Sequence, residues 1–115
     1  MSLPDNWPTN TFQQIAEWGE VETERIEVAS IDELKEKLTR LVAWLIDNQP
    51  EKLMYILYRV DVNETESKKV LSDPSVPDPA SRIAEMLIAR QKTKDEFKAA
   101  HPVPRPSSED EDLLL

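Results

Sequence analysis

Apolar residues recur at steps of three and four through the middle of the chain, which is the period of an amphipathic helix. Ser30 and Glu33 have the spacing of a capping box, in which the serine oxygen accepts a backbone N–H and the glutamate reaches back. The pattern predicts a helix over residues 31–47. Its apolar stripe consists of Ile31, Leu34, Leu38, Leu41, Val42 and Leu45.

A second helix is predicted directly after the first. Asn48 and Glu51 have the spacing of a cap, and Pro50 suits a first helical turn because its missing N–H would have no partner there. From Pro50 to Val60 this helix is apolar on almost every side. Such a helix either lies at the centre of a core or presents part of its surface to a partner.

Two more polar caps mark two more helices. Asn63 begins a short helix over about 64–71, and Asp78, which a proline follows, begins a longer one. The longer helix ends at Phe97 or Ala100, before a proline-rich stretch. Its inward face is predicted to consist of Ala80, Ile83, Ala84, Leu87 and Ile88.

The two ends of the chain give other patterns. Residues 11–18 read as a short helix that stops at Gly19, and the alternation within 21–29 hints at a strand, although a lone strand has nothing to pair with. Residues 101–115 carry three prolines, two serines and four consecutive acids, a composition typical of disorder.

The prediction is therefore an all-α fold: a small bundle of about four helices over 30–100, an acidic N-terminal extension over 1–29 and a disordered acidic C-terminal tail over 101–115. A core of roughly 70 residues is marginal for stability, since small domains bury a smaller share of their surface. Oligomerisation or packing by the N-terminal segment would stabilise it. The residues that would supply this packing are Trp7, Phe12 and Trp18.

The charge is concentrated at the ends of the chain. Residues 1–29 carry six acids and one base, residues 30–100 carry thirteen acids and twelve bases, and residues 101–115 carry four acids and one base. The whole chain of 115 residues has a formal charge of -9. An acidic chain of this kind does not favour a polyanion as its ligand.

Composition excludes several kinds of site. The single glycine rules out a glycine-rich phosphate cradle, the absence of cysteine rules out thiolate sites, and the single histidine, His101, rules out sites with two imidazoles. Asp61 and Asn63 resemble the start of a calcium loop, but Glu66 stands where that loop requires glycine. We predict no metal and no cofactor.

The sequence does not favour an enzyme. Pairs of carboxylates are expected by chance among 23 acids, His101 reads as a solvated side chain, and no serine has the flanking glycines of a nucleophile elbow. We expect no catalytic residues, while a site built from carboxylates and tyrosines remains a third hypothesis.

Nucleic acid and membrane are not expected as partners. The helices around residues 61–63 have the outline of a helix-turn-helix, but the second would carry Glu64 and Glu66 towards a polyanion. The longest apolar runs, 41–46 and 53–58, are far shorter than the roughly 20 residues that cross a bilayer. The N-terminus shows no signal segment, so the expected location is cytoplasmic.

Protein binding remains as the favoured activity. A candidate partner surface combines residue types that are common at interfaces, and consists of Trp44, Met54, Tyr55, Tyr58 and Arg59. The alternative is that the tyrosines belong to the core, with their hydroxyls at its edge. A candidate tail contact is formed by three leucines after the acidic run, namely Leu113, Leu114 and Leu115, which would dock in a groove or stay solvated.

Two segments carry a resemblance, LYRVDVNE at 57–64 and IAEMLIARQ at 83–91. Together they resemble a group of short, uncharacterised bacterial all-helical proteins, over about residues 40–98. The resemblance implies a small helical cytoplasmic protein, and it brings no activity, cofactor or site residue to this chain.

The leading hypothesis is a non-enzymatic protein–protein interaction or regulatory protein, which binds a protein partner or associates with itself, for example as a homodimer. The alternative is an acidic inhibitor or immunity-type protein that presents its negative ends to a basic partner. Binding of that second kind would weaken steeply with salt, because exposed charges are screened over about 10 Å at 0.1 M.

Overall fold

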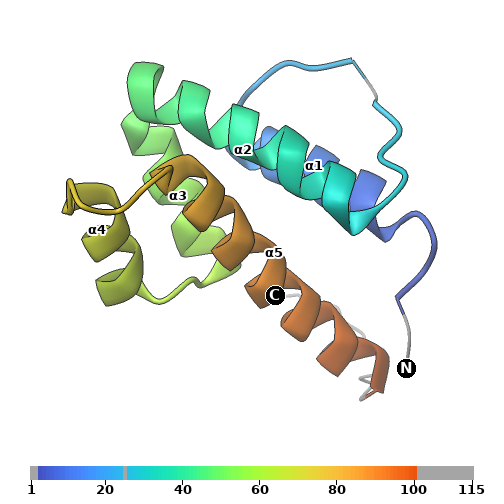
Figure 1. Cartoon of the computed structure of the whole chain (residues 1–115). Helices are drawn as coiled ribbons and strands as arrows, with labels where there is room; N and C mark the ends of the chain where they lie inside the picture. The colour runs from blue at the N-terminus through green and yellow to red at the C-terminus, as the bar shows by residue number, and fades with distance from the viewer. Residues whose placement is uncertain (1–2, 25, 101–115) are drawn as a thin grey trace, which may run out of the picture.

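Five helices make up the part of the chain that the structure describes, residues 3–24 and 26–100 of a computed structural model (Figure 1). No strand occurs within these residues. The helices are α1 (Trp7–Trp18), α2 (Ile31–Asn48), α3 (Pro50–Val60), α4 (Glu64–Ser72) and α5 (Pro79–Ala100). The all-helical prediction is confirmed.

Within the described residues, the bundle has one helix more than the predicted four, because α1 is part of it. Helix α1 begins at Trp7, four residues before the predicted start, and Pro8 lies in its first turn, where the missing N–H needs no partner. Trp7, Phe12 and Ile15 of this helix are buried with the core residues of α2, α3 and α5. The N-terminal segment therefore helps to build the core.

The core forms between α2 and α5, which make the most extensive helix contact in the described part of the chain. The predicted stripes are buried, apart from Ile31 at the start of α2. They pack against buried side chains of α3 and α1. Burial of these stripes is what holds such short helices together, because isolated helices of this length are marginal in water.

Three of the predicted caps, at Ser30, Asn63 and Asp78, have the expected geometry, and the Asp78 Oδ1 accepts the N–H of Ser81 at 3.3 Å. The Ser30 Oγ accepts the N–H of Glu33 at 3.1 Å, and the Glu33 carboxylate accepts the N–H of Ala29 at 2.9 Å. The Asn63 Oδ1 accepts the N–H of Glu66 at 2.8 Å. These side chains satisfy backbone donors that have no partner within their own helix.

The predicted cap at Asn48 is wrong. Asn48 is the last residue of α2, and its side-chain N–H donates to the carbonyl of Trp44 at 2.9 Å. Gln49 alone connects the two helices, and it makes no side-chain cap for α3. Asn48 is still helical, so its amide satisfies a carbonyl at the end of α2 rather than a donor at the start of α3.

The strand suggested within 21–29 is also absent from the described residues of that segment. The backbone groups of Val28 form hydrogen bonds with a side chain instead. The Thr9 Oγ1 accepts the N–H of Val28 at 2.8 Å and donates to its carbonyl at 3.2 Å. Both residues are buried. A single threonine on α1 thus fixes the long connection that leads to α2.

The end of α3 is fastened to α5. Asp61 ends α3 in a left-handed conformation, and the Arg90 guanidinium donates to both its carbonyl and its carboxylate at 3.1 Å. None of the helices in residues 3–24 and 26–100 is long and apolar enough to span a bilayer. The predicted disorder of the tail and the position of His101 fall outside the residues that the structure describes.

Candidate functional site

The outer face of α3 carries four of the five candidate surface residues, Met54, Tyr55, Tyr58 and Arg59. Met54, Tyr55 and Tyr58 are exposed, and Tyr58 keeps 78% of its surface accessible. The opposite face is buried, and consists of Leu53, Ile56, Leu57 and Val60. The sequence of α3 is apolar on almost every side, but the structure buries only one side and exposes the other to solvent. Its tyrosines therefore do not belong to the core.

Arg59 joins this face to α1. The centre of its guanidinium group lies 5.1 Å from the centroid of the Trp18 ring and 5.9 Å from that of the Tyr55 ring. Its Nη1 also donates to the Tyr55 hydroxyl at 3.3 Å. A cation held over aromatic rings is attracted by their electron-rich faces, so these three side chains hold one another in place.

Trp18 thus belongs to the same surface, although the sequence marked it only as a packing residue. Nothing in the local pattern of α1 signals this, because the contact depends on how α1 packs against α3. We call the set Trp18, Met54, Tyr55, Tyr58 and Arg59 the α3 surface. Its residues are all at the surface or partly buried.

A hollow extends the α3 surface towards α4. It has a volume of about 430 Å³, and its lining combines Met54 and Tyr58 with Asp61, Glu64 and Ser67. The carboxylates of Asp61 and Glu64 pair with Arg90 and Lys68. An apolar side chain of a partner would contact the methionine and the tyrosine there.

Trp44 is not joined to the α3 surface. It lies on α2 and is 47% exposed, but the contacts that link Trp18, Tyr55 and Arg59 do not include it. The predicted surface of five residues is thus brought together only in part. The candidate tail contact, Leu113–Leu115, lies outside the described residues.

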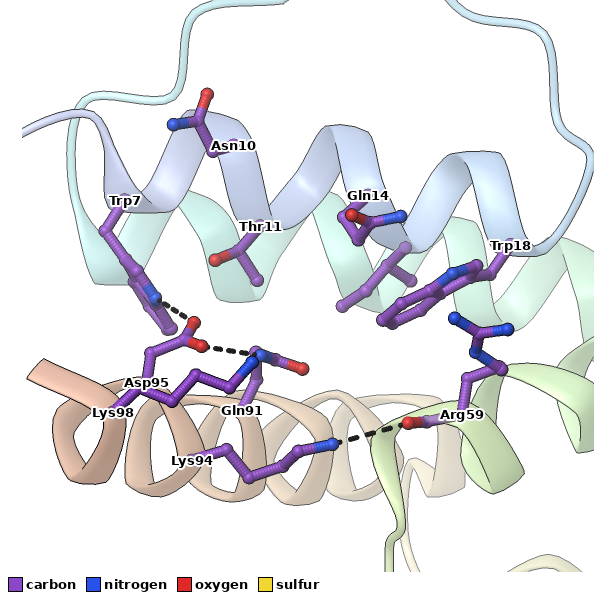
Figure 2. Close-up of a pocket in the computed structure, with 11 residues that line it drawn as sticks. Trp7, Asn10, Thr11, Gln14, Trp18, Arg59, Gln91, Lys94, Asp95 and Lys98 are labelled. Atoms are coloured by element: carbon purple, nitrogen blue, oxygen red, sulfur yellow. Dashed lines mark hydrogen bonds between the residues drawn. The ribbon is translucent and has the colours of Figure 1, made fainter. Parts of the chain in front are cut away.

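A second hollow, of about 450 Å³, lies between α1, α3 and α5 (Figure 2). On one side of it Asp95 accepts the indole N–H of Trp7 at 2.7 Å and the side-chain N–H of Gln91 at 3.0 Å. On the other side the Lys94 ammonium donates to the carbonyls of Arg59 and Val60. A cation suits this position, since the C-terminal end of a helix carries partial negative charge.

Exposed partners lower the pKa of several carboxyls. The Lys35 ammonium holds the pKa of Glu85 below its ordinary value of 4.5, and Arg82 adds to the effect. Hydrogen bonds and charge from lysine side chains lower the pKa of Glu20 and Glu64 in the same way, while the Ser75 hydroxyl lowers that of Asp73. These shifts arise in exposed ion pairs and a turn.

No cluster of three or more metal-binding side chains occurs among the described residues. Comparison with known proteins gives no match to a protein family, a curated protein or a solved structure. The case for a function therefore depends on the geometry of this chain.

Proposed function

We propose that this chain is a non-enzymatic interaction protein that binds a protein partner through the α3 surface. The observation that carries the proposal is the exposure of Tyr58, beside Tyr55 and Met54, on a helix whose other face is fully buried. Contiguous exposed apolar side chains on a small protein commonly mark an interaction site. Tyrosine and arginine in particular contribute much of the binding energy at interfaces.

Part of the α3 surface, formed by Trp18, Tyr55 and Arg59, is ordered before binding. Arg59 lies between Trp18 and Tyr55 and bonds to the tyrosine hydroxyl, so these side chains have already lost much of their freedom. Binding then costs less conformational entropy than it would for free side chains. A partner with an apolar side chain and a carbonyl or carboxylate oxygen would complement the aromatic rings and the guanidinium group. A second copy of this chain is one form that such a partner takes.

Site-specific photo-cross-linking tests the proposal in the full chain. A photoreactive phenylalanine at position 58 is compared with the same group at position 97, since Phe97 is also an exposed aromatic residue but lies on α5. Position 58 is expected to give a discrete protein adduct, and mass spectrometry identifies it as another protein or a second copy. Equal adducts at both positions would refute the α3 surface.

The partner found in this way is then titrated with variants. The double variant Tyr55→Ser/Tyr58→Ser should bind at least about 30-fold more weakly, as expected for loss of a hot spot of 2 kcal/mol or more. Its stability should change little, because exposed substitutions usually stay within about 0.5 kcal/mol. Leu57→Ala, on the buried face, should instead cost about 2–5 kcal/mol of stability. Unchanged binding by the double variant contradicts the proposal.

The acidic-inhibitor hypothesis also has an observation in its favour. One hollow beside Val21 is lined by three acidic residues, Glu17, Glu22 and Glu24. None of the three forms an ion pair within the described part of the chain. A basic partner would bind there with strong dependence on salt. Glu22→Gln/Glu24→Gln would weaken that binding and leave binding through Tyr58 unchanged.

A further inference from the structure

The hollow between α1, α3 and α5 is positively charged, although the chain as a whole is acidic. Three cations line it, namely Arg59, Lys94 and Lys98. Most lysines and arginines of the described chain form an ion pair with a carboxylate, but these three do not. The one acid in the lining, Asp95, already accepts hydrogen bonds from Trp7 and Gln91. The hollow therefore has cations in excess.

The lining also has an apolar part. The rings of Trp7 and Trp18 stand at its two ends, and Arg59 lies against Trp18 (Figure 2). An occupant with carboxylates and apolar side chains would match the cations and the rings, and an acidic peptide segment has this chemistry.

We propose that this hollow binds the acidic C-terminal segment of the same chain, residues 109–115. The sequence of that segment is Glu-Asp-Glu-Asp followed by three leucines. Its four carboxylates are complementary to the three cations, and its leucines offer apolar contact to the two tryptophans. The residues after Ala100 lie outside the described part of the chain, and the proposal uses only their sequence.

The length of the chain permits this contact. α5 ends at Ala100, two residues after Lys98, which already lines the hollow. Residues 101–108 separate the end of the helix from the first acid, and three of these eight are proline. At about 3.1 Å per residue in an extended proline-rich conformation they reach about 25 Å. The lining along α5, from Gln91 to Lys98, extends only about 10 Å at 1.5 Å per residue.

Tethering makes weak contacts sufficient. A segment joined by a short linker has an effective concentration in the millimolar range, so a millimolar affinity, from the charge pairs and the leucine contacts together, is enough to keep it bound for much of the time. Arg59 belongs both to the hollow and to the α3 surface, so the bound segment would place negative charge at the edge of that surface. The inference goes beyond the proposed function and does not depend on it, since it requires no partner.

A spin label placed beside the acidic run tests the proposal. The chain has no cysteine, so Ser108→Cys gives a single site for a nitroxide on the full chain. In NMR spectra at low salt, the amides of residues 91–98 and the indole signals of Trp7 and Trp18 should lose intensity. The amides of α4 and the indole of Trp44, which do not line the hollow, should be much less affected. Uniform loss of intensity over the molecule would overturn the proposal.

Matched variants separate binding from chance proximity. Lys98→Gln removes a cation of the hollow, while Lys92→Gln removes an exposed lysine of α5 that does not line it and forms no ion pair among the described residues. Lys98→Gln should lower the ratio of bound to free segment about two- to fivefold, as expected for one exposed charge pair, and Lys92→Gln should leave it unchanged. Equal effects of the two variants would refute the assignment.

Two further measurements complete the test. The variant Glu109→Gln/Asp110→Asn/Glu111→Gln/Asp112→Asn should abolish the selective loss of intensity, and 1 M salt should weaken it, because the screening length falls to about 3 Å. Spin-labelled chains are also mixed with isotope-labelled chains that carry no nitroxide. Selective loss in that mixture would show that the segment binds a second copy, which overturns binding within one chain. Tyr55→Ser/Tyr58→Ser should leave the pattern unchanged, so failure here is distinct from failure of the α3 surface.

Discussion

Replacement of Thr9 by valine gives a direct test of how the connection between α1 and α2 is held. Thr9 is 2% exposed and Val28 is 3% exposed, and one hydroxyl satisfies both the N–H and the carbonyl of Val28. Valine has nearly the same shape, so Thr9→Val removes the hydroxyl and leaves the packing almost unchanged. The N–H and the carbonyl of Val28 then stay buried without a partner.

The magnitude follows from the cost of unsatisfied buried groups. Each such group costs about 1–3 kcal/mol, so two of them should lower the free energy of unfolding by about 2–6 kcal/mol. A small domain has about 5–15 kcal/mol in total, so this loss is a large share. Thr9→Ser is the matched control, because it keeps the hydroxyl and loses one methyl group. That loss should cost only about 1 kcal/mol.

Urea denaturation followed by circular dichroism measures both variants. With a slope of about 1–3 kcal/mol per molar urea, Thr9→Val should move the midpoint down by about 1 M or more, and Thr9→Ser by clearly less. Packing alone predicts the opposite order, since valine preserves the volume and serine does not. If Thr9→Val is as stable as the wild type and Thr9→Ser is weaker, the hydrogen-bond argument is wrong.

Two other predictions concern the ion pairs and the hollow. The exposed carboxyls with lowered pKa values stabilise the fold at a pH above their ordinary pKa of 4.5. This contribution to the free energy of unfolding should disappear as the pH falls through the lowered pKa values. Lys35→Gln returns the pKa of Glu85 towards its ordinary value, so it should reduce the fall of the urea midpoint between pH 7 and pH 3. Lys92→Gln serves as the control. An unchanged dependence of the midpoint on pH in Lys35→Gln would contradict this prediction. Asp95→Ala should cost about 1–3 kcal/mol and shift the indole N–H resonance of Trp7, because the buried indole loses its acceptor, whereas an unmoved resonance would show that the bond is not formed in solution.

The α3 surface and the α1–α3–α5 hollow meet at one residue. The Arg59 guanidinium stacks on Trp18 and bonds to Tyr55, while its backbone carbonyl accepts the Lys94 ammonium. Its side chain is thus fixed from α1 and α3, and its main chain from α5. A change at this residue should affect both sites, so Lys98 and Tyr58 are the better positions at which to separate them.

Local patterns in the sequence were sufficient to predict most helices. The stripe of α2 and the inward face of α5 have helical spacing, and burial follows that spacing in the structure. The caps at Ser30 and Asn63 depend on side chains three residues from the donor they satisfy, so their signals are contained in the sequence. The cap predicted at Asn48 failed because an asparagine at a helix end can satisfy either a carbonyl or an N–H, and sequence spacing does not distinguish them.

What the sequence determined by itself is the all-helical class, the main helix boundaries and the apolar stripes, because each depends on residues within a few positions of one another. Only the tertiary structure decided which apolar side chains stay exposed to solvent and which charged side chains lie close together. Tyr58 is exposed because α3 packs on α1, α2 and α5 with its other face. Arg59 and Lys94 share a hollow because α3 ends against α5, a contact between residues 35 positions apart in the chain. Contacts of that kind depend on how helices cross, and no local pattern encodes them.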